Sequence, residues 1–264
     1  MISLIFNNVF YEPFLNGLIW LIDVLPFHDV GLSVIILTLA IRFLIFPLTH
    51  RATVTQIKIK QLEPDLKNIK EKFKSNSQEQ AKKTMELYRR HGINPFSGFL
   101  TLLIQIPVFF ALYKIFTAGF NFDFSHLYSF ISMPENINLK FLGLFDMTKN
   151  SYVLAFLTGL TQFIQMRLAL PPVKKEPIAK ASFKNDFARS LNLQMRYIMP
   201  VFIFFIVSRL SSAIGLYWTT MNIFAIVHET IVRKKAGKIY GTANKNNQII
   251  SGGGSGENDS QRRN

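Results

Sequence analysis

Long runs of apolar residues alternate with polar stretches along most of this chain. A helix needs about 20 predominantly apolar residues to cross the roughly 30 Å hydrocarbon core of a bilayer. Five runs predict transmembrane helices, and they lie at 30–50, 93–118, 151–170, 195–212 and 213–232. The pattern therefore predicts an all-α, polytopic membrane protein.

The fourth predicted span has the shortest apolar stretch, because only 12 residues separate Arg196 from Arg209. At 1.5 Å per residue this stretch covers about 18 Å, which is well short of a bilayer. We expect either that both arginine side chains extend outward to the interfaces or that the bilayer is thinned here.

Residues 1–29 precede the first span and have a helical pattern of their own. Their apolar positions recur at helical spacing, at Phe10, Phe14, Leu18, Leu21 and Leu25. Glu12, Asn16 and Asp23 lie elsewhere on the helical wheel. We predict an amphipathic helix that lies on the extracytoplasmic surface. The alternative is a short spanning helix, which Glu12 and Asp23 make too polar to cross easily.

The polar stretch 51–92 predicts a helical hairpin. Apolar residues recur in both halves at the spacing of one narrow helical seam, at Leu62, Leu66, Ile69, Phe73, Ala81, Met85 and Tyr88. Ser77 with Gln80 three residues later has the pattern of a capping box. We therefore expect Ser77 to cap the second helix of the hairpin.

Basic residues are concentrated in three segments of the chain. Of the 30 Lys and Arg residues, 25 lie in 51–92, 167–196 and 233–264. The segments 1–29 and 119–150 carry two between them. The positive-inside rule then predicts that the N-terminus lies outside and the C-terminus inside.

In this topology the loop 119–150 is extracytoplasmic, and the loop 171–194 and the tail 233–264 are cytoplasmic. The tail is basic and ends in the low-complexity stretch "SGGGSGENDSQRRN", which we expect to be partly disordered.

The composition agrees with a membrane protein and argues against several kinds of site. Hydrophobic residues make up 49% of the chain and charged residues only 17%. There is no cysteine, which excludes disulfides, zinc-thiolate sites and a thiol nucleophile. The sequence has no GxxxxGK[ST] or HExxH motif and no Ser/His or Asp pair within the spans. We predict no metal, no cofactor and no enzymatic activity.

Arg42 is a charged residue inside the first apolar run, "LSVIILTLAIRFLIFPLTHR". On a straight helix it lies nine residues before Arg51, roughly 13 Å below the cytoplasmic interface. An arginine at that depth must face protein or water. One interpretation is structural, with Arg42 held by backbone carbonyls that Pro47 leaves free. The other is that Arg42 lines a water-filled cavity open to the cytoplasm.

Other spans supply polar residues for such a cavity, whereas none supplies a carboxylate near its middle. The residues that we expect to line it with Arg42 are Gln105, Gln162, Thr219 and Asn222. An arginine without a permanent counter-ion suits a site that attracts a transient acidic or polar guest.

Several motifs occur together in these segments. They are "RFLIFPLTHR" with a following "LEP", "NP" before "LLIQIP", "MP" in the fourth span, and "GLYW" with a later Asn in the fifth. In this combination, over about residues 10–235, the chain resembles the YidC/Oxa family of membrane protein insertases. It is similar to the compact five-span form, without the extra first span, large outer domain or lipid-anchored cysteine of other members.

The resemblance implies roles for particular residues. Arg42 would receive hydrophilic parts of a substrate, with Gln105 and Asn222 lining the groove around it. An apolar slide, along which a nascent segment passes into lipid, would consist of Ile106, Phe109, Phe202, Ile203 and Ile206. For any one of these five residues, a plain lipid-facing role is an equally open interpretation. The hairpin would be the cytoplasmic coiled coil of the family.

The expected function is insertion of nascent membrane proteins into a bacterial plasma membrane, without nucleotide hydrolysis; an organellar inner or thylakoid membrane is the other possible location. Expected partners are nascent chains, membrane lipids, a Sec-type translocon, and the ribosome through the basic tail and loops. The lysines could instead serve only topology and contact with anionic lipid. We expect the protein to act as a monomer. The alternative function is a small channel or transporter, for which internal repeats or intramembrane carboxylates would be typical.

Overall fold

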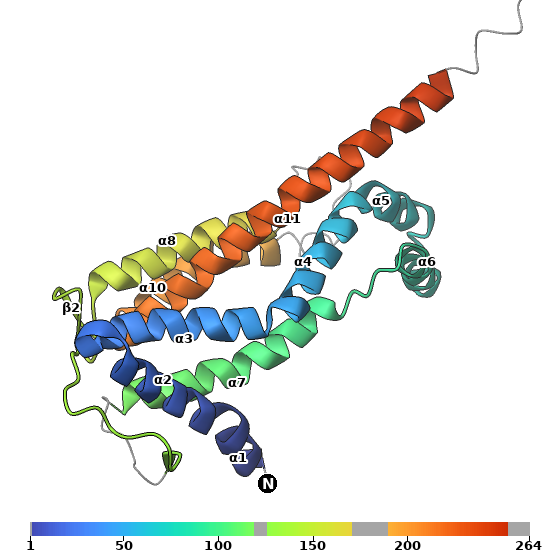
Figure 1. Ribbon diagram of the computed structural model, residues 1–264. Coiled ribbons are helices and arrows are strands. Elements are labelled where there is room, and N and C mark those ends of the chain that lie inside the picture. The colour runs from blue at the N-terminus through green and yellow to red at the C-terminus, as the bar shows by residue number, and fades with distance from the viewer. Residues whose placement is uncertain (1, 119–125, 171–189, 253–264) are drawn as a thin grey trace, which may run out of the picture.

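The computed structural model describes residues 2–118, 126–170 and 190–252, with only the backbone for 2, 98–102 and 236–252. Helices make up most of the described chain, as predicted (Figure 1). Its strands are the short antiparallel pair β1 (Lys140–Phe141) and β2 (Phe145–Asp146). Parts of the expected loops 119–150 and 171–194, and the end of the tail from 253, lie outside the described residues.

The N-terminal segment is helical from residue 2 to residue 24. It consists of α1 (Ile2–Phe6), the π-helical turn η1 (Asn7–Tyr11) and α2 (Glu12–Val24). Leu25 then becomes extended, and the short 3-10 turn η2 (Pro26–His28) leads into the next helix. The expected helix is therefore present.

The buried face of α2 differs from the expected one. Leu15, Leu18, Ile19 and Ile22 are fully buried, and Asn16 is buried with them. The Asn16 amide donates to the His126 carbonyl (2.9 Å) and accepts from the Tyr128 amide (2.8 Å). Asn16 was expected on the polar side of the wheel, but it ties the helix to the outer loop, because these bonds satisfy a buried amide.

The opposite face of this N-terminal segment is apolar and exposed. Its exposed large side chains are Leu4, Ile5, Val9, Trp20 and Val24. A helix with one apolar face on protein and another exposed is suited to a membrane surface.

The first predicted span bends instead of continuing straight to residue 50. Helix α3 (Val30–Leu44) ends at Ile45, and α4 (Phe46–Gln61) continues at an angle of 66° to it. Pro47 causes the break, because its ring has no N–H and clashes with the carbonyl four residues earlier. The straight-helix depth of roughly 13 Å for Arg42 therefore does not hold.

Helices α5 (Glu63–Lys72) and α6 (Ser77–Arg90) follow α4 and pack on each other, apart from the long helices (Figure 1). Asn76, and not Ser77, caps α6: its side chain accepts from the Glu79 amide at 3.1 Å. Leu66 and Ile69 are half-buried as expected. In the second helix Tyr88 is also half-buried as expected, whereas Ala81 and Met85 are exposed, so the expected seam is wrong at these two positions.

The remaining long helices alternate in direction along the chain (Figure 1). They are α7 (Ser97–Thr117), α8 (Tyr152–Ala169), α10 (Met199–Val207) and α11 (Ser212–Gly252). Contacts join α11 to α8, α3 and α7, and α8 to α10. Gly159 permits the close approach of α8 and α10, since an added Cβ would lie 3.2 Å from the Pro200 carbonyl.

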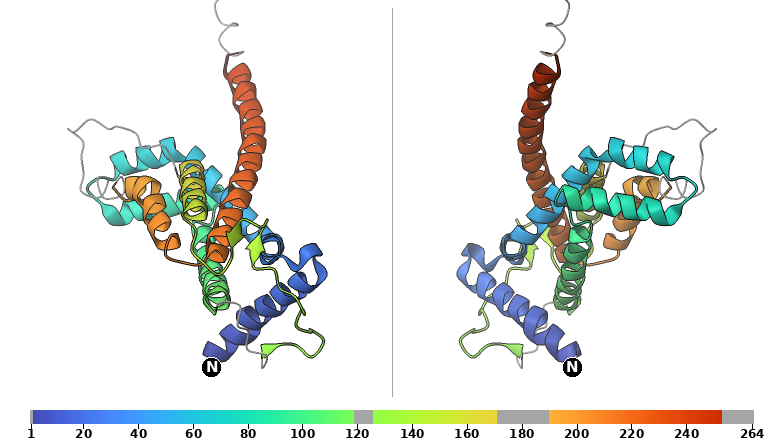
Figure 2. Two further views of the ribbon diagram at one scale, coloured as in Figure 1. Left: turned by 90° about the vertical axis from the view of Figure 1, so that its left-hand side faces the viewer. Right: turned by 90° about the vertical axis from the view of Figure 1, so that its right-hand side faces the viewer.

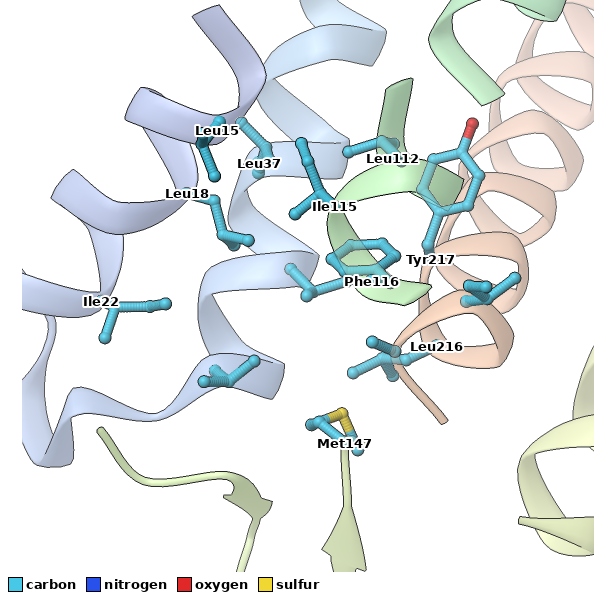
Figure 3. Packing of buried hydrophobic residues seen from close by; sticks show 14 of the residues in the cluster. Leu15, Leu18, Ile22, Leu37, Leu112, Ile115, Phe116, Met147, Leu216 and Tyr217 are labelled. Atoms are coloured by element: carbon cyan, nitrogen blue, oxygen red, sulfur yellow. The ribbon is translucent and has the colours of Figure 1, made fainter. Parts of the chain in front are cut away.

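The main apolar core lies between α2, α3, α7 and the start of α11. Leu18 of α2, Leu37 of α3, and Ile115 and Phe116 of α7 meet there (Figure 3). Tyr217 belongs to this cluster, and its hydroxyl points away from the other labelled side chains (Figure 3). This core fixes α3, α7 and α11 relative to one another.

The fourth predicted span is longer than expected from its two arginines. Helical structure runs from Ser190 through the π-helical turn η5 (Gln194–Ile198) to the end of α10. Ser190–Val207 covers 18 residues, or about 27 Å, which is close to the thickness of the hydrocarbon core. Arg196 is buried and donates to the Leu170 carbonyl at the end of α8 (3.1 Å), whereas Arg209 is exposed.

Among the described residues, one unbroken helical segment, Ser190–Val207, is long and apolar enough to cross a membrane. Helices α3 and α4 pass the same test together, as a bent pair. Only 22% of Ser190–Val207 is buried. This exposure distinguishes the segment from the core helix of a soluble protein, which would be mostly covered. Leu103–Thr117 of α7 is a shorter apolar helix.

Helix α11 continues beyond the expected end of the fifth span at residue 232. Its backbone remains helical to Gly252, and its C-terminal part extends away from the N-terminal helices (Figure 2). The helix therefore does not end where apolar residues give way to basic ones near Arg233.

Candidate functional site

Arg42 lies in the last turn of α3, just before the bend. The carbonyl groups at a helix C-terminus carry partial negative charge, which favours a cation there. The side chain is half-buried. The bend thus places a guanidinium at the end of a helix inside the bundle.

The Arg42 guanidinium forms no hydrogen bond or ion pair with the part of the chain that the structure describes. Its electrostatic neighbours include Tyr217 and His228, both on α11. The Tyr217 hydroxyl accepts a hydrogen bond of 2.8 Å from the Gln105 amide on α7. Arg42, Gln105 and Tyr217 therefore bring α3, α7 and α11 together around a cation whose five N–H donors remain available.

Gln162, Thr219 and Asn222 lie at a different place, in the contact between α8 and α11. The hydroxyls of Thr219 and Thr158 share a hydrogen bond of 2.9 Å. The Asn222 amide donates to the Thr161 hydroxyl at 3.2 Å. All three predicted residues are buried, so their hydrogen bonds serve the packing of α8 on α11.

Trp218 connects this polar contact with α7. Its indole N–H donates to the Gln162 side-chain oxygen at 3.1 Å, and its ring lies 5.5 Å from that of Phe109. Trp218 also packs against the small cluster of Ala155, Ile203 and Val207 between α8 and α10. It is half-buried and adjoins Tyr217 in the chain.

The five predicted slide residues have unequal exposure. Ile106 on α7 and Phe202 on α10 are exposed. Phe109 and Ile206 are half-buried, and Ile206 borders a cavity of about 400 Å³ on α10. Ile203 is buried against α8, so it supports the α10 surface from behind instead of forming it.

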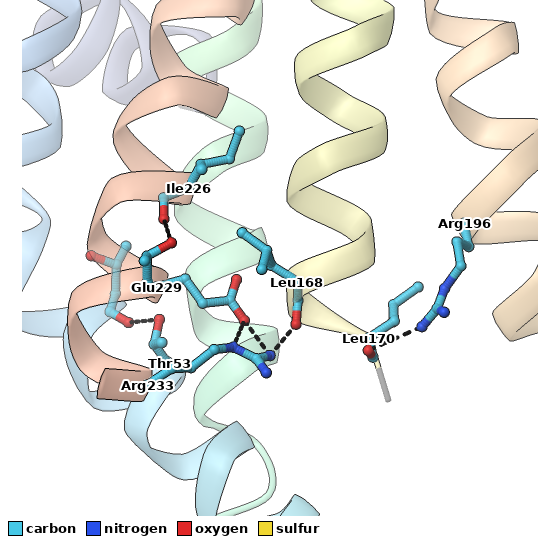
Figure 4. Close-up of polar contacts among 9 residues, drawn as sticks. Thr53, Leu168, Leu170, Arg196, Ile226, Glu229 and Arg233 are labelled. Atoms are coloured by element: carbon cyan, nitrogen blue, oxygen red, sulfur yellow. Dashed lines mark hydrogen bonds and ion pairs between the residues drawn. The ribbon is translucent and has the colours of Figure 1, made fainter. Parts of the chain in front are cut away.

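A cluster of charged residues lies where the C-terminal ends of α4 and α8 adjoin the middle of α11. Arg233 pairs with Glu229, with a shortest nitrogen-to-oxygen distance of 2.7 Å, and also donates to the Leu168 carbonyl (Figure 4). Arg196 reaches the Leu170 carbonyl nearby. Burial, with the neighbouring Arg233, lowers the pKa of Lys60 below its ordinary value, while Glu229 acts in the opposite direction.

Sequence reasoning missed Tyr217 and Trp218 as parts of the site. Both lie in the "GLYW" motif, and their polar groups are the available signal, because buried Tyr and Trp usually find a hydrogen-bond partner. It also missed the ion pair of Glu229 and Arg233, whose i, i+4 spacing is the signal.

Comparison with known proteins identifies relatives over most of the chain. A model of the family described as "60Kd inner membrane protein" matches residues 21–238. A protein of Fusobacterium nucleatum named "Membrane protein insertase YidC" is 31% identical over 205 residues, which is 78% of this chain and 86% of that protein.

Two further relatives have the same printed name. The protein of Oceanobacillus iheyensis is 30% identical over 238 residues, which is 87% of this chain and 84% of the relative. The protein of Wolinella succinogenes is 30% identical over 204 residues, which is 77% of this chain. The match covers only 33% of the Wolinella protein, so this relative is considerably longer than the present chain.

Proposed function

Because this chain belongs to the YidC/Oxa family of membrane protein insertases, we propose that it inserts nascent transmembrane segments into a bacterial plasma membrane. It does so without nucleotide hydrolysis and without covalent chemistry. Its substrates are nascent membrane proteins, and the relatives' names support this assignment.

The proposed topology has five spans, formed by α3, α7, α8, the helix that ends with α10, and the first half of α11. The alternating direction of these helices (Figure 1) supports this topology. Helices α8 and α11 are less apolar than an ordinary span because they carry polar residues in the contact between them. These residues are Gln162, Thr158 and Asn222. The N-terminus lies outside, and the hairpin of α5 and α6 lies in the cytoplasm.

Arg42 is the proposed receiving group for a polar or acidic part of the substrate. Its guanidinium has donors that the described chain does not use, and it lies beside the polar pair of Gln105 and Tyr217. A carboxylate can accept two parallel N–H bonds from a guanidinium. Hydrogen bonds from Arg42 would replace part of the hydration that the polar tail of the substrate loses while it crosses.

The apolar part of the substrate is proposed to pass along the exposed side chains of Ile106 and Phe202, with Phe109, Ile203 and Ile206 behind them. Moving apolar surface out of water is favourable by about 25 cal/mol per Å². For a segment of about 20 apolar residues, this term is large enough to drive insertion without nucleotide. Trp218 contacts Phe109 and Gln162 and so joins the polar and apolar surfaces.

The observation that carries this proposal is the guanidinium of Arg42 with no partner among the described residues. We expect Arg42→Ala to reduce insertion of substrates with an acidic translocated tail about ten-fold, the loss expected for one charge-assisted hydrogen bond of about 1.5 kcal/mol. Arg42→Lys, which keeps the charge, should lose less. The measurement is insertion into proteoliposomes that contain the purified variants.

Substrates with an uncharged tail provide the control and should be affected much less by either substitution. Equal activity of the parent, Arg42→Ala and Arg42→Lys with acidic tails would contradict the proposed role. Solute flux through the same proteoliposomes without substrate separates insertion from a channel or transporter, and we expect none.

The ribosome is a proposed partner of the basic cytoplasmic end. Lys234 and Lys235 are exposed at the start of the helical extension of α11, and basic side chains on an extended helix suit contact with RNA phosphates. Membrane lipids and a Sec-type translocon are further proposed partners, and the proposed functional unit is a monomer.

A further inference from the structure

A cavity of about 530 Å³ lies in the elbow between α3, α4 and α11. We call it the elbow cavity. Its lining residues Phe224, His228 and Lys235 lie on the same face of α11 as Tyr217, about two to five turns further along the helix. Its volume lies within the range of about 300–1,000 Å³ that is typical of small-molecule sites. Most of its walls are apolar or aromatic, and its lining includes Phe43, Phe46, Val54, Ile57, Phe224 and Val227.

Ring contacts hold the wall of the elbow cavity in place. Phe46 lies 5.5 Å from the ring of His50 and 4.9 Å from that of His228. The two histidines share a hydrogen bond of 3.0 Å, which ties α4 to α11. Phe224 lies 5.4 Å from Phe43. The cavity is thus a built feature of the bend at Ile45.

The elbow cavity opens onto an exposed apolar surface. Phe43 is 64% exposed, and Val227 and Ile231, which also line it, are about half exposed. None of these three side chains belongs to the main core. In a membrane-spanning protein such a surface faces hydrocarbon chains.

The charged residues that line the elbow cavity are all positive. Lys58 on α4 and Lys235 on α11 contribute to the lining, and none of the lining residues is acidic. Both lysines lie toward the cytoplasmic end in the proposed topology, where the inner leaflet contains anionic lipids. An apolar cavity with a basic edge is complementary to an anionic amphiphile.

We propose that the elbow cavity binds an anionic phospholipid of the cytoplasmic leaflet. One acyl chain fills the apolar part, and the phosphate lies near Lys58 and Lys235. This inference rests on the proposed topology but not on insertase activity. A transmembrane helix of a substrate is about 10–12 Å across and about 20 residues long, which is too large for this cavity, whereas a single acyl chain is not.

Native mass spectrometry of the full chain released from detergent tests the headgroup. The probes are phosphatidylglycerol and phosphatidylcholine with identical acyl chains. We expect the parent to prefer phosphatidylglycerol, and each lysine removed to reduce this preference about five-fold. Lys58→Gln with Lys235→Gln should therefore abolish most of it. The matched control, Lys70→Gln with Lys74→Gln, removes the same charge from exposed positions of the hairpin and should leave the preference unchanged.

A second variant tests the acyl chain. Val227→Trp fills the elbow cavity from an exposed position of α11, so the fold should tolerate it. We expect this variant to bind both lipids less while thermal unfolding in detergent stays close to that of the parent. An unchanged headgroup preference in the lysine variant, or unchanged lipid binding in Val227→Trp, would overturn the proposal.

Photocrosslinking in native membranes identifies the molecule that occupies the elbow cavity. A photoreactive amino acid at Ile231, which lines the elbow cavity, should form adducts with lipid. Adducts mainly with polypeptide would show that a substrate or partner segment occupies the cavity, and would also overturn the proposal. Neither result bears on the role of Arg42 in insertion, which is tested by the separate insertion assay.

Discussion

At the scale of single residues, Arg42 differs from Arg196 and Arg233 in having no hydrogen-bond or ion-pair partner among the described residues. Arg196 and Arg233 reach backbone carbonyls at the end of α8, and Arg233 also pairs with Glu229. Those two cations are held by the protein and serve its structure. Arg42 lies at the end of α3 with unused donors, which is the arrangement expected of a group that binds something transient.

Lys60 offers a test of the charged cluster, because its pKa depends on named neighbours. Burial and Arg233 lower this pKa, and Glu229 raises it. A lysine whose pKa is lowered in the folded protein destabilises the fold while it is charged, and this penalty is relieved as the pH rises through the folded pKa towards 10.5. Removing the Glu229 carboxylate should lower the pKa of Lys60 further.

We therefore expect Glu229→Gln to increase the fraction of neutral Lys60, and hence its acylation rate, at mildly alkaline pH. Mass spectrometry of proteolytic fragments measures the rate at Lys60 and, in the same sample, at the exposed Lys70. The rate at Lys70 should stay the same. Slower acylation of Lys60 in the variant would contradict the described arrangement.

At the scale of elements, the contact between α8 and α11 depends on polar side chains. Thr158 is fully buried, and its hydroxyl shares a hydrogen bond with Thr219 and approaches the Gly215 carbonyl at 3.0 Å. Interhelical hydrogen bonds in membranes are worth about 0.6 kcal/mol on average and up to about 1.7 kcal/mol. In the same contact between α8 and α11, the indole N–H of Trp218 donates to the Gln162 side chain.

Thr158→Val keeps the shape of the side chain and removes its hydroxyl. We expect a loss of about 0.5–1.5 kcal/mol in the free energy of unfolding, measured by denaturant unfolding in detergent micelles. Thr117→Val is the matched control, since the hydroxyl of Thr117 is exposed and bonds only within its own helix. Equal stability of both variants would show that the hydroxyl of Thr158 is not needed for this contact.

The sequence could predict these elements in kind but not in all their bounds. Apolar periodicity identifies the long helices, because each must cover about a bilayer's thickness. The bend at Ile45 follows from Pro47, yet its angle depends on the packing of α4 against α7 and α11. The end of α11 could not be predicted from charge, since a helix can leave the membrane without stopping.

The candidate site was predictable only in part for a similar reason. Arg42 stands out in any apolar run, so one sequence suffices to find it. Whether Gln162 and Asn222 face a groove or a neighbouring helix depends on helix rotation, and both are buried against α8 or α11. The burial of Ile203 depends likewise on the close approach that Gly159 permits.

At the scale of the whole molecule, polar and apolar surfaces meet along one helix. On α7, Gln105 points to Tyr217, and the next residue, Ile106, is exposed. Successive residues of a helix differ by about 100° in direction, since a turn takes 3.6 residues. A substrate lying along α7 can therefore place its polar part towards Arg42 and its apolar part towards lipid.

Photocrosslinking from these neighbouring positions tests this central claim most directly. A photoreactive amino acid replaces Gln105 or Ile106 in the full chain, and ribosome-bound nascent membrane proteins of increasing length are then offered in membranes. The account predicts that position 105 crosslinks to the polar tail and position 106 to the apolar segment of the same substrate. Leu160, an exposed residue of α8, is the control and should give little product. Equal crosslinking from Leu160, or none from position 105, would contradict it.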